Sequence, residues 1–552
     1  MKEHKDYKSI FNSFSSSTQN QKDKQLNTER EQYSLSLRKK KMNNYLMKRR
    51  EENVEESQIK KLKKNPYEII PEKLEISEEI RNKTYYSPSS FSDAMINLLE
   101  SQNINEIKFA IYHIRNQTLR SEFPIEEMYK KNIVDKLMMT IFNNINKYDI
   151  VYEITWALIN FSIRINNDNL MIFLTNIPCI QIYIKIFDLN DKSLTENVLW
   201  LISNIIIGCD SASENIFFSP IPRKYLLQFV ENKEVNNQIT KICIKLFSSL
   251  SQFINTIYRY IQIEGLENQL FKKHSDVNVN NIQENIIYLE EHLTKIFLKF
   301  VNFNDQEIIN DCIFGLSNLS NSSNIKIHDL IYSSGLIGNI ITNQINSSDI
   351  IFHKILELIG NFLSNFTGVI EPILQNQIIS FILKFINSKN NCDIKRNSFW
   401  IISNLLCIPN VNVINIVNSG IIPFVIDAIQ NSENKVGIEG LFIINDIIFN
   451  ENFIETVINF VKNYEIIKIL ISVIQKYYEE PEGLKLILVI CLHLFEIGNK
   501  YSNLFDGKNI FLEEFQLNGG NLYIEKLQNY NDQIIYNYVE TIIRVYFNTS
   551  IE

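Results

Sequence analysis

A tryptophan, three residues and an asparagine recur together along the chain, each time inside an apolar run. Four further segments keep the run and the phase but replace the Trp, and one of them replaces the Asn as well. The Asn position advances by 44, 45, 69, 43, 43 and 41 residues between copies. Self-similarity at such a period indicates a repeat architecture. The full copies hold Trp156 and Asn160, Trp200 and Asn204, and Trp400 and Asn404; the partial copies hold Ser249, Asn318, Asn361 and Asn445.

The period matches that of armadillo and HEAT repeats, which is about 40–47 residues. Each repeat consists of two or three helices whose apolar faces are buried only by stacking on the next repeat. A Gly precedes an apolar helix in phase with the repeats, in 333–342, 418–427 and 518–527, as expected where one helix ends and another begins. The sequence therefore predicts an all-α armadillo-repeat solenoid, a right-handed superhelix of about ten repeats over 91–552. The single long step predicts a loop insertion near 263–287.

Composition agrees with this fold class. The hydrophobic content of 45% fits a globular protein, and 15 Gly and 11 Pro in 552 residues are too few for an all-β protein. The 7 Cys are scattered without a CxxC pair, and the first residues, MKEHKDYKSI, lack the apolar run of a signal peptide. We therefore expect a soluble intracellular protein without membrane insertion.

The N-terminal part is different in character. We expect a disordered polar tail over 1–27, a basic segment over 28–64 and a linker over 65–90. The basic segment has seven Lys and Arg between Arg38 and Arg50, and residues 1–64 carry a net charge of +8 against −16 for 65–552. A cationic arm thus precedes an anionic body. The acidic body argues against broad binding to nucleic acid, for which a basic surface is needed.

The Trp–Asn pairs suggest a binding surface. A Trp and an Asn four residues apart share one helix face. An Asn amide both donates and accepts, so it can bond the backbone of an extended peptide, and neighbouring indoles can hold the stem of a Lys or Arg. The alternative is that these side chains are core, which is the commoner role for a Trp in a solenoid. The recurrence of Asn in phase favours the binding surface, because a buried mid-helix Asn needs a partner.

With these features the chain resembles a divergent member of the importin alpha (karyopherin alpha) family over nearly its whole length. The segment LRKKKMNNYLMKRR (37–50) is similar to the family's importin-beta-binding segment. The Trp–Asn pairs are similar to its cargo groove, and GGNLYIEKLQNYNDQIIYNYVETIIRVYF (519–547) resembles its last repeat. The resemblance implies a major and a minor cargo site. The major site would comprise Trp156, Asn160, Trp200, Asn204, Asp210 and Ser249, and the minor site Asn318, Glu357, Asn361, Trp400, Asn404 and Asn445.

The chain departs from the family's pattern at several of these positions. Lys245 and Ser249 stand where the fourth repeat should supply an indole and an amide. The family's aspartate after the third-repeat Asn falls on Gly208, with Asp210 two residues later. Leu441 replaces the eighth-repeat indole, and Glu357 replaces a sixth-repeat arginine. Lys245 and Ser249 predict a shortened major site, because a cation there would repel a basic cargo. At the minor site Glu357 could either serve a basic cargo or face solvent.

The resemblance also implies partners and a function. The chain would be a nuclear import adaptor that carries cargo with basic nuclear-localisation signals, shuttles between cytoplasm and nucleus, and meets an export receptor at its C-terminal repeats. The arm would recruit an importin-beta-type receptor and fold back onto the cargo groove when no receptor is present. Its residues would be Arg30, Arg38, Lys39, Lys40, Lys41, Lys48, Arg49 and Arg50.

Other functions have less support from the sequence. No phosphate loop, HExxH motif or nucleophile elbow is present, and the 7 His are dispersed. We therefore expect no enzyme activity, no metal and no cofactor. The alternative function is an armadillo scaffold with an eroded groove that binds specialised or folded protein partners.

Overall fold

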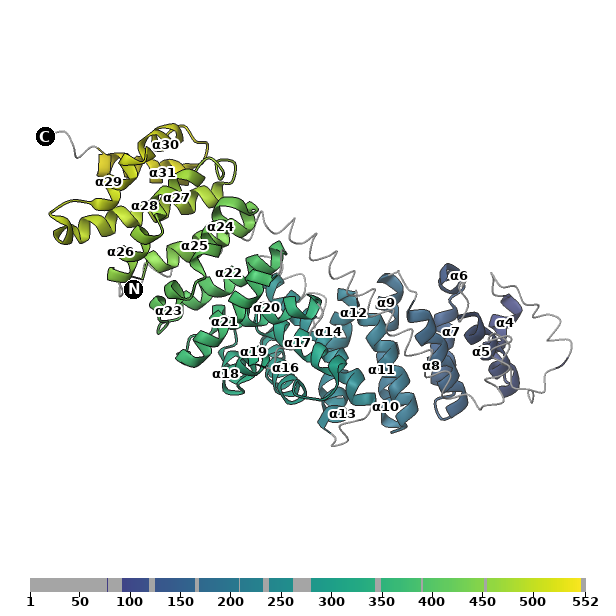
Figure 1. Ribbon diagram of the computed structural model, residues 1–552. Helices are drawn as coiled ribbons and strands as arrows, with labels where there is room; N and C mark the ends of the chain where they lie inside the picture. Colours follow the sequence, from purple (N-terminus) through teal and green to yellow (C-terminus); the bar gives the residue numbers. More distant parts are fainter. Residues whose placement is uncertain are drawn as a thin grey trace. The chain divides into compact units, whose positions relative to one another are not determined.

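The structure is a computed structural model, and it describes residues 77, 92–118, 125–163, 168–207, 209–231, 238–261, 279–342, 349–388, 391–450 and 454–547. The predicted tail, the basic segment with all of its Lys and Arg, and Gly208 lie outside the described residues. So does the predicted linker apart from Ser77. Every regular element within the described residues is a helix (Figure 1).

The chain divides into two compact units, Met1–Ile257 and Tyr258–Glu552. The described helices that begin in the first unit are α4 (Asp93–Asn97), η1 (Leu98–Glu100), α5 (Ile104–Thr118), α6 (Ile125–Lys130), α7 (Ile133–Asn143), α8 (Tyr148–Ser162), α9 (Asp168–Leu174), α10 (Ile177–Asp188), α11 (Lys192–Ile206), α12 (Asp210–Phe218), η2 (Ile221–Leu226), α13 (Leu227–Glu231) and α14 (Gln238–Ile261).

The second unit continues the same pattern. Its described helices are α16 (Val279–Phe300), α17 (Gln306–Leu319), α18 (Ile325–Ser333), α19 (Leu336–Thr342), α20 (Asp349–Asn365), α21 (Pro372–Ser388), α22 (Cys392–Leu406), α23 (Val413–Asn418), α24 (Ile422–Asn431), α25 (Asn434–Ile448), α26 (Ile454–Asn463), α27 (Ile466–Val473), α28 (Pro481–Lys500), η4 (Ser502–Phe505), α29 (Ile510–Leu517), α30 (Gly520–Leu527), α31 (Gln533–Ile542) and η5 (Ile543–Phe547).

One long helix closes each repeat, and we call these the third helices. In the first unit α5 packs on α8 and α8 on α11. In the second unit α17, α20, α22, α25, α28 and α31 pack consecutively (Figure 1). Together with α14 they make ten third helices among the described residues, the last of each repeat as the sequence predicts. The prediction of an all-α armadillo solenoid is confirmed.

Short polar side chains set the start of several third helices. The Asp191 carboxylate accepts from the backbone N of Leu194 at 2.9 Å at the start of α11. Asp305, Asn391 and Asp532 cap α17, α22 and α31 in the same way. These caps satisfy backbone donors that the helix leaves unpaired, which stabilises a helix by about 1 kcal/mol. These four third helices therefore begin where an Asp or Asn caps the first turn.

A glycine with positive φ precedes each of three helices, α19, α24 and α30. Gly335, Gly420 and Gly519 have φ values of +66°, +85° and +80°, and they precede α19, α24 and α30. No neighbouring atom lies within 4 Å of a Cβ built at any of the three. Backbone conformation, not space, is therefore the reason for Gly here. The sequence prediction that these glycines separate helices is confirmed.

One boundary differs from the prediction. The loop insertion was expected near 263–287, but α16 begins at Val279, so 279–287 are helical. The segment 262–278 lies outside the described residues. The Asn-rich composition of 278–285 predicts a loop, yet Ile286, Leu289 and Leu293 recur at helical spacing and are buried. Burial of this stripe outweighs the low helix propensity of Asn.

Among the described residues no single helix is long and apolar enough to cross a bilayer. One pair, α9 with α10, passes this test jointly although it is bent by 48°.

Candidate functional site

The residues of the Trp–Asn phrases lie on successive third helices, and we call this set the ladder. In the first unit Trp156 and Asn160 lie on α8, Trp200 and Asn204 on α11, and Ser249 on α14. In the second unit Asn318 lies on α17, Glu357 and Asn361 on α20, Trp400 and Asn404 on α22, and Asn445 on α25. The structure therefore places these predicted groove residues on the third helices of each unit, whereas the predicted Asp210 lies on α12.

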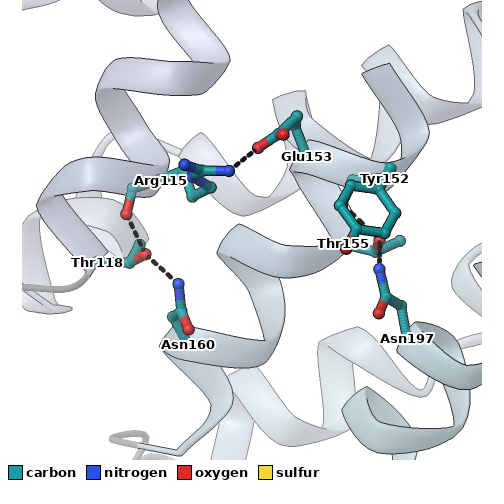
Figure 2. Close-up of polar contacts among 7 residues, drawn as sticks. All are labelled: Arg115, Thr118, Tyr152, Glu153, Thr155, Asn160 and Asn197. Atoms are coloured by element: carbon teal, nitrogen blue, oxygen red, sulfur yellow. Dashed lines mark hydrogen bonds and ion pairs between the residues drawn. The ribbon is translucent and has the colours of Figure 1, made fainter. Parts of the chain in front are cut away.

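Ladder amides in the first unit bond the repeat before them. The Nδ2 of Asn160 on α8 donates to the Thr118 Oγ1 on α5 at 3.1 Å (Figure 2). The Nδ2 of Asn204 on α11 donates to the Ser162 Oγ on α8 at 3.0 Å. All four side chains are buried. Each bond therefore holds one third helix to the next, worth about 0.5–1.5 kcal/mol.

The second unit repeats this bond with backbone acceptors. The Nδ2 of Asn361 donates to the Ser317 carbonyl at 3.2 Å, and the Nδ2 of Asn404 to the Gly360 carbonyl at 3.1 Å. Asn445 differs, because its Nδ2 donates to the neighbouring Asp446 Oδ1 at 3.4 Å. An Asn amide has two N–H donors and one acceptor oxygen, so a bond between repeats uses only part of its capacity. The Asn periodicity thus has a structural cause that does not depend on a ligand.

A further asparagine bridges the same helices and was missed by the sequence reasoning. The Nδ2 of Asn197 donates to the Thr155 Oγ1 at 3.0 Å, and Thr155 in turn donates to the Tyr152 carbonyl (Figure 2). Asn197 stands three residues before Trp200, and Asn397 stands three before Trp400. This recurrence is the signal in the sequence that could have found it.

Aromatic rings extend the ladder along α8. Tyr148 and Tyr152 stack with ring centroids 5.5 Å apart, and Tyr152 meets Trp156 edge-on at 6.3 Å. Their spacing of four residues keeps the three rings on one face. Trp156 and Trp200 are each 5% exposed. The face of α8 is therefore an aromatic stripe in which the indole is well covered.

Trp400 packs on a glycine of the preceding repeat. A Cβ built at Gly360 on α20 would lie 1.9 Å from Cζ3 of Trp400. The same glycine accepts the Asn404 hydrogen bond through its carbonyl. The indole and the amide of one ladder step therefore both contact Gly360, and only a residue without a side chain leaves room for them.

The fourth repeat breaks the ladder. The Lys245 Nζ on α14 lies 5.8 Å from the centroid of the Trp200 ring, within the range of a cation–π contact. Ser249 is buried, and its hydroxyl donates to the Lys245 carbonyl at 3.2 Å, one turn back on its own helix. α14 thus adds a cation to the face of the third-repeat indole.

Two carboxylates expected to serve a basic cargo have neighbours of their own. Asp210 is exposed in the first turn of α12, where desolvation and the nearby Asp168 carboxylate raise its pKa. Glu357 pairs with the Lys354 Nζ at 2.6 Å and accepts from the Ser317 hydroxyl at 3.3 Å. The Lys354 Nζ also lies 4.9 Å from the centroid of the Phe314 ring. Lys354 therefore stands over an aromatic side chain at a ladder position.

Charged pairs join α5 to α8 beside the ladder. Arg115 pairs with Glu153 (Figure 2), and Lys108 pairs with Asp149 at 3.0 Å. Burial raises the pKa of Glu153, and the Arg115 guanidinium opposes that shift. Burial also raises the pKa of Tyr112, beside Arg115, to about 12. These pairs add to the amide bonds that fix neighbouring third helices.

Within the described residues no three His, Cys, Asp or Glu side chains gather so that they could hold a metal ion. The arm residues Arg30 to Arg50 lie outside the described residues, so their predicted contacts stay predictions.

Comparisons with known proteins agree with the fold. No family model matches the chain. Importin subunit alpha-1a of Oryza sativa subsp. japonica is 24% identical over 124 residues, which is 22% of this chain and 23% of that protein. The match thus spans less than a quarter of the curated relative.

Among solved structures, an engineered protein from the Northeast Structural Genomics Consortium has a TM-score of 0.60 and 13% identity, covering 82% of this chain and 97% of that one. A designed armadillo repeat protein in complex with the peptide (KR)4 has a TM-score of 0.36 and 14% identity, covering 45% and 97%. The consecutively packed third helices and the similarity to the engineered protein agree with the all-α armadillo solenoid.

Proposed function

We propose that this protein is a nuclear import adaptor. Its ladder would bind an extended basic peptide, a nuclear-localisation signal, and its basic arm would recruit an importin-beta-type receptor. The observation that carries the proposal is the pairing of an indole and an amide on three third helices, of which α8 and α11 are neighbours: Trp156 with Asn160, Trp200 with Asn204, and Trp400 with Asn404 on α22.

The chemistry of the ladder supports this function. The amides hold neighbouring helices at a fixed spacing, so side chains of successive repeats recur along each unit. Indole faces attract lysine and arginine with about 0.5–2 kcal/mol each. A peptide in extended conformation carries side chains at a regular spacing, which a regular series of such faces can read. The partial match to importin subunit alpha-1a supports the same function.

Charge supports the role of the arm. Residues 1–64 carry +8 and the rest of the chain −16, so the arm is attracted both by an acidic receptor and by its own body. Lys48, Arg49 and Arg50 would act as a cargo mimic, and Arg38 to Lys41 chiefly as the receptor segment. The adaptor would shuttle between cytoplasm and nucleus and meet an export receptor at its C-terminal repeats.

Substitution of ladder indoles tests cargo binding. The full chain with Lys48, Arg49 and Arg50 replaced by Ala is titrated against a fluorescent basic peptide, and affinity is measured by anisotropy. Trp200→Ala and Trp400→Ala should each weaken binding by about 1–3 kcal/mol, the usual cost of removing an anchor. Phe142→Ala is the matched control, because Phe142 is an aromatic side chain outside the ladder and is 45% exposed. Affinity unchanged by both Trp substitutions in folded protein would reject the adaptor function.

A second candidate is an armadillo scaffold that binds folded or specialised partners. Three observations favour it: Leu441 is fully buried where an indole was expected, Trp156 and Trp200 are each only 5% exposed, and Lys245 stands over Trp200. A scaffold would bind its partners equally well after both Trp substitutions. The same titration, repeated with captured partner proteins, therefore separates the two functions.

A further inference from the structure

The fourth repeat replaces an anchor with a cation. Lys245 follows Trp200 by 45 residues, and Trp200 follows Trp156 by 44. Lys245 is therefore the residue at which the ladder would present its next indole. Its ammonium group turns back toward the third repeat, 5.8 Å from the Trp200 ring centroid. Because Lys245 stands in place of an indole, α14 presents no aromatic face at this position. The same side chain places a positive charge at the Trp200 ring on α11.

The rest of the fourth-repeat face does not restore the lost contacts. Ser249, at the amide position, is buried and bonds its own helix at the Lys245 carbonyl. Lys241 stands one turn before Lys245 and shares its helix face. The ladder face of the first unit therefore changes along the repeats, from the rings of Tyr148, Tyr152 and Trp156 on α8 to two lysines on α14.

The second unit has an independent example of the same arrangement. The Lys354 Nζ lies 4.9 Å from the centroid of Phe314, which occupies the Trp position of its repeat. In that case the lysine also pairs with Glu357 on its own helix at 2.6 Å. A carboxylate thus stands beside a lysine that covers a ladder ring.

A lysine or arginine of a peptide would meet a like charge at the Trp200 face. Two unit charges a few ångströms apart repel each other at a protein surface by an amount that changes affinity severalfold or more. A carboxylate at the same place would be attracted by Lys245 and Lys241. We propose that Lys245 is a specificity-determining residue: it closes the Trp200 face to basic side chains and selects a peptide with an acidic residue there, next to basic residues read by α8. This inference rests on the proposed peptide binding by the ladder.

A charge-reversal experiment tests the proposal. The full chain carries the triple Ala substitution of Lys48, Arg49 and Arg50. It is titrated with a set of labelled basic peptides in which each position in turn is changed to Glu. The scan is repeated with Lys245→Met, which keeps an apolar stem over the indole without the charge, and with Lys245→Glu. Lys185→Met is the matched control, because its ammonium group also covers a ring, Phe142, at 4.1 Å, but on α10 outside the ladder.

We expect one position in the peptide at which the peptide with Glu binds the parent protein about tenfold more tightly than the peptide with Lys. Lys245→Met should abolish this preference at that position, and Lys245→Glu should reverse it, whereas Lys185→Met should leave the whole scan unchanged. Identical scans for the parent and both Lys245 variants would overturn the role of Lys245 and leave the adaptor function standing. If none of the peptides binds the folded parent protein, the adaptor function fails and the inference fails with it. Thermal midpoints of each variant establish that it is folded.

Discussion

Gly360 has no side chain because the indole of Trp400 occupies the space where one would begin. A Cβ there would lie 1.9 Å from Trp400 Cζ3. We predict that Gly360→Ala displaces the indole and destabilises the second unit by about 1–3 kcal/mol, as overpacking does. Gly338→Ala is the matched control, since the nearest atom to its new methyl would be the Gln377 Oε1 at 3.4 Å. Thermal midpoints measure both; equal midpoints would contradict the packing described for Trp400.

Also at the residue scale, Glu439 on α25 links stability to pH. It is half-buried, and burial raises its pKa from the ordinary 4.5 to about 7; Arg396 lowers this value, and Glu482 and Asp446 raise it. Below pH 4.5 the carboxyl is neutral in both the folded and the unfolded chain. As the pH rises from 4.5 through 7 the unfolded chain loses the proton first, so the folded state loses stability.

We therefore predict that Glu439→Gln stabilises the protein above pH 7 by about 1–2 kcal/mol. This range is smaller than the full pKa shift would give, because solvent reaches part of the Glu439 side chain. The difference should vanish near pH 4.5. Thermal midpoints of the variant and the wild type at pH 4.5, 6 and 8 measure this. A constant difference across the three values would show that ionisation of Glu439 is not the cause.

At the scale of elements, the ladder amides act as ties between third helices. The Asn204 amide on α11 and the Ser162 hydroxyl on α8 are both buried and 3.0 Å apart. We predict a coupling energy of about 1 kcal/mol in a double-mutant cycle of Asn204→Ala and Ser162→Ala. Amide hydrogen exchange should show that the single variants loosen α8 and α11 before other helices. A cycle with additive energies would mean that the hydrogen bond contributes nothing to the stacking.

Elements were also the scale at which the sequence was most informative. The period located all the third helices that carry the ladder, because each must bury an apolar stripe against the next. It did not reveal what Asn160 and Asn204 bond, since Thr118 and Ser162 belong to other repeats and match no motif. The start of α16 was missed because its first turns are polar. The sequence does not predict where the Lys245 ammonium group lies, because a long flexible side chain can point into solvent or toward the neighbouring third helix.

At the scale of the whole molecule, charge decides how the arm competes with cargo. The arm carries +8 and the remaining chain −16, so their attraction is long-ranged at low salt and screened over about 8 Å at physiological ionic strength. We predict that removal of residues 1–64 raises affinity for a basic peptide. The gain in affinity should be greatest at low salt and should shrink as the salt concentration increases. At high salt the tether still keeps the arm near the body, but screening removes the electrostatic attraction between them.

Fluorescence anisotropy of one basic peptide with the full and the shortened chain, from 50 mM to 1 M salt, measures this gain. Replacing Lys48, Arg49 and Arg50 by Ala in the full chain is the matched control, because it removes the expected cargo mimic but keeps the length of the tether. It should reproduce most of the gain at low salt. Equal affinities of the full and the shortened chain at every salt concentration would remove self-inhibition from the proposed function, and the arm would then serve only the receptor.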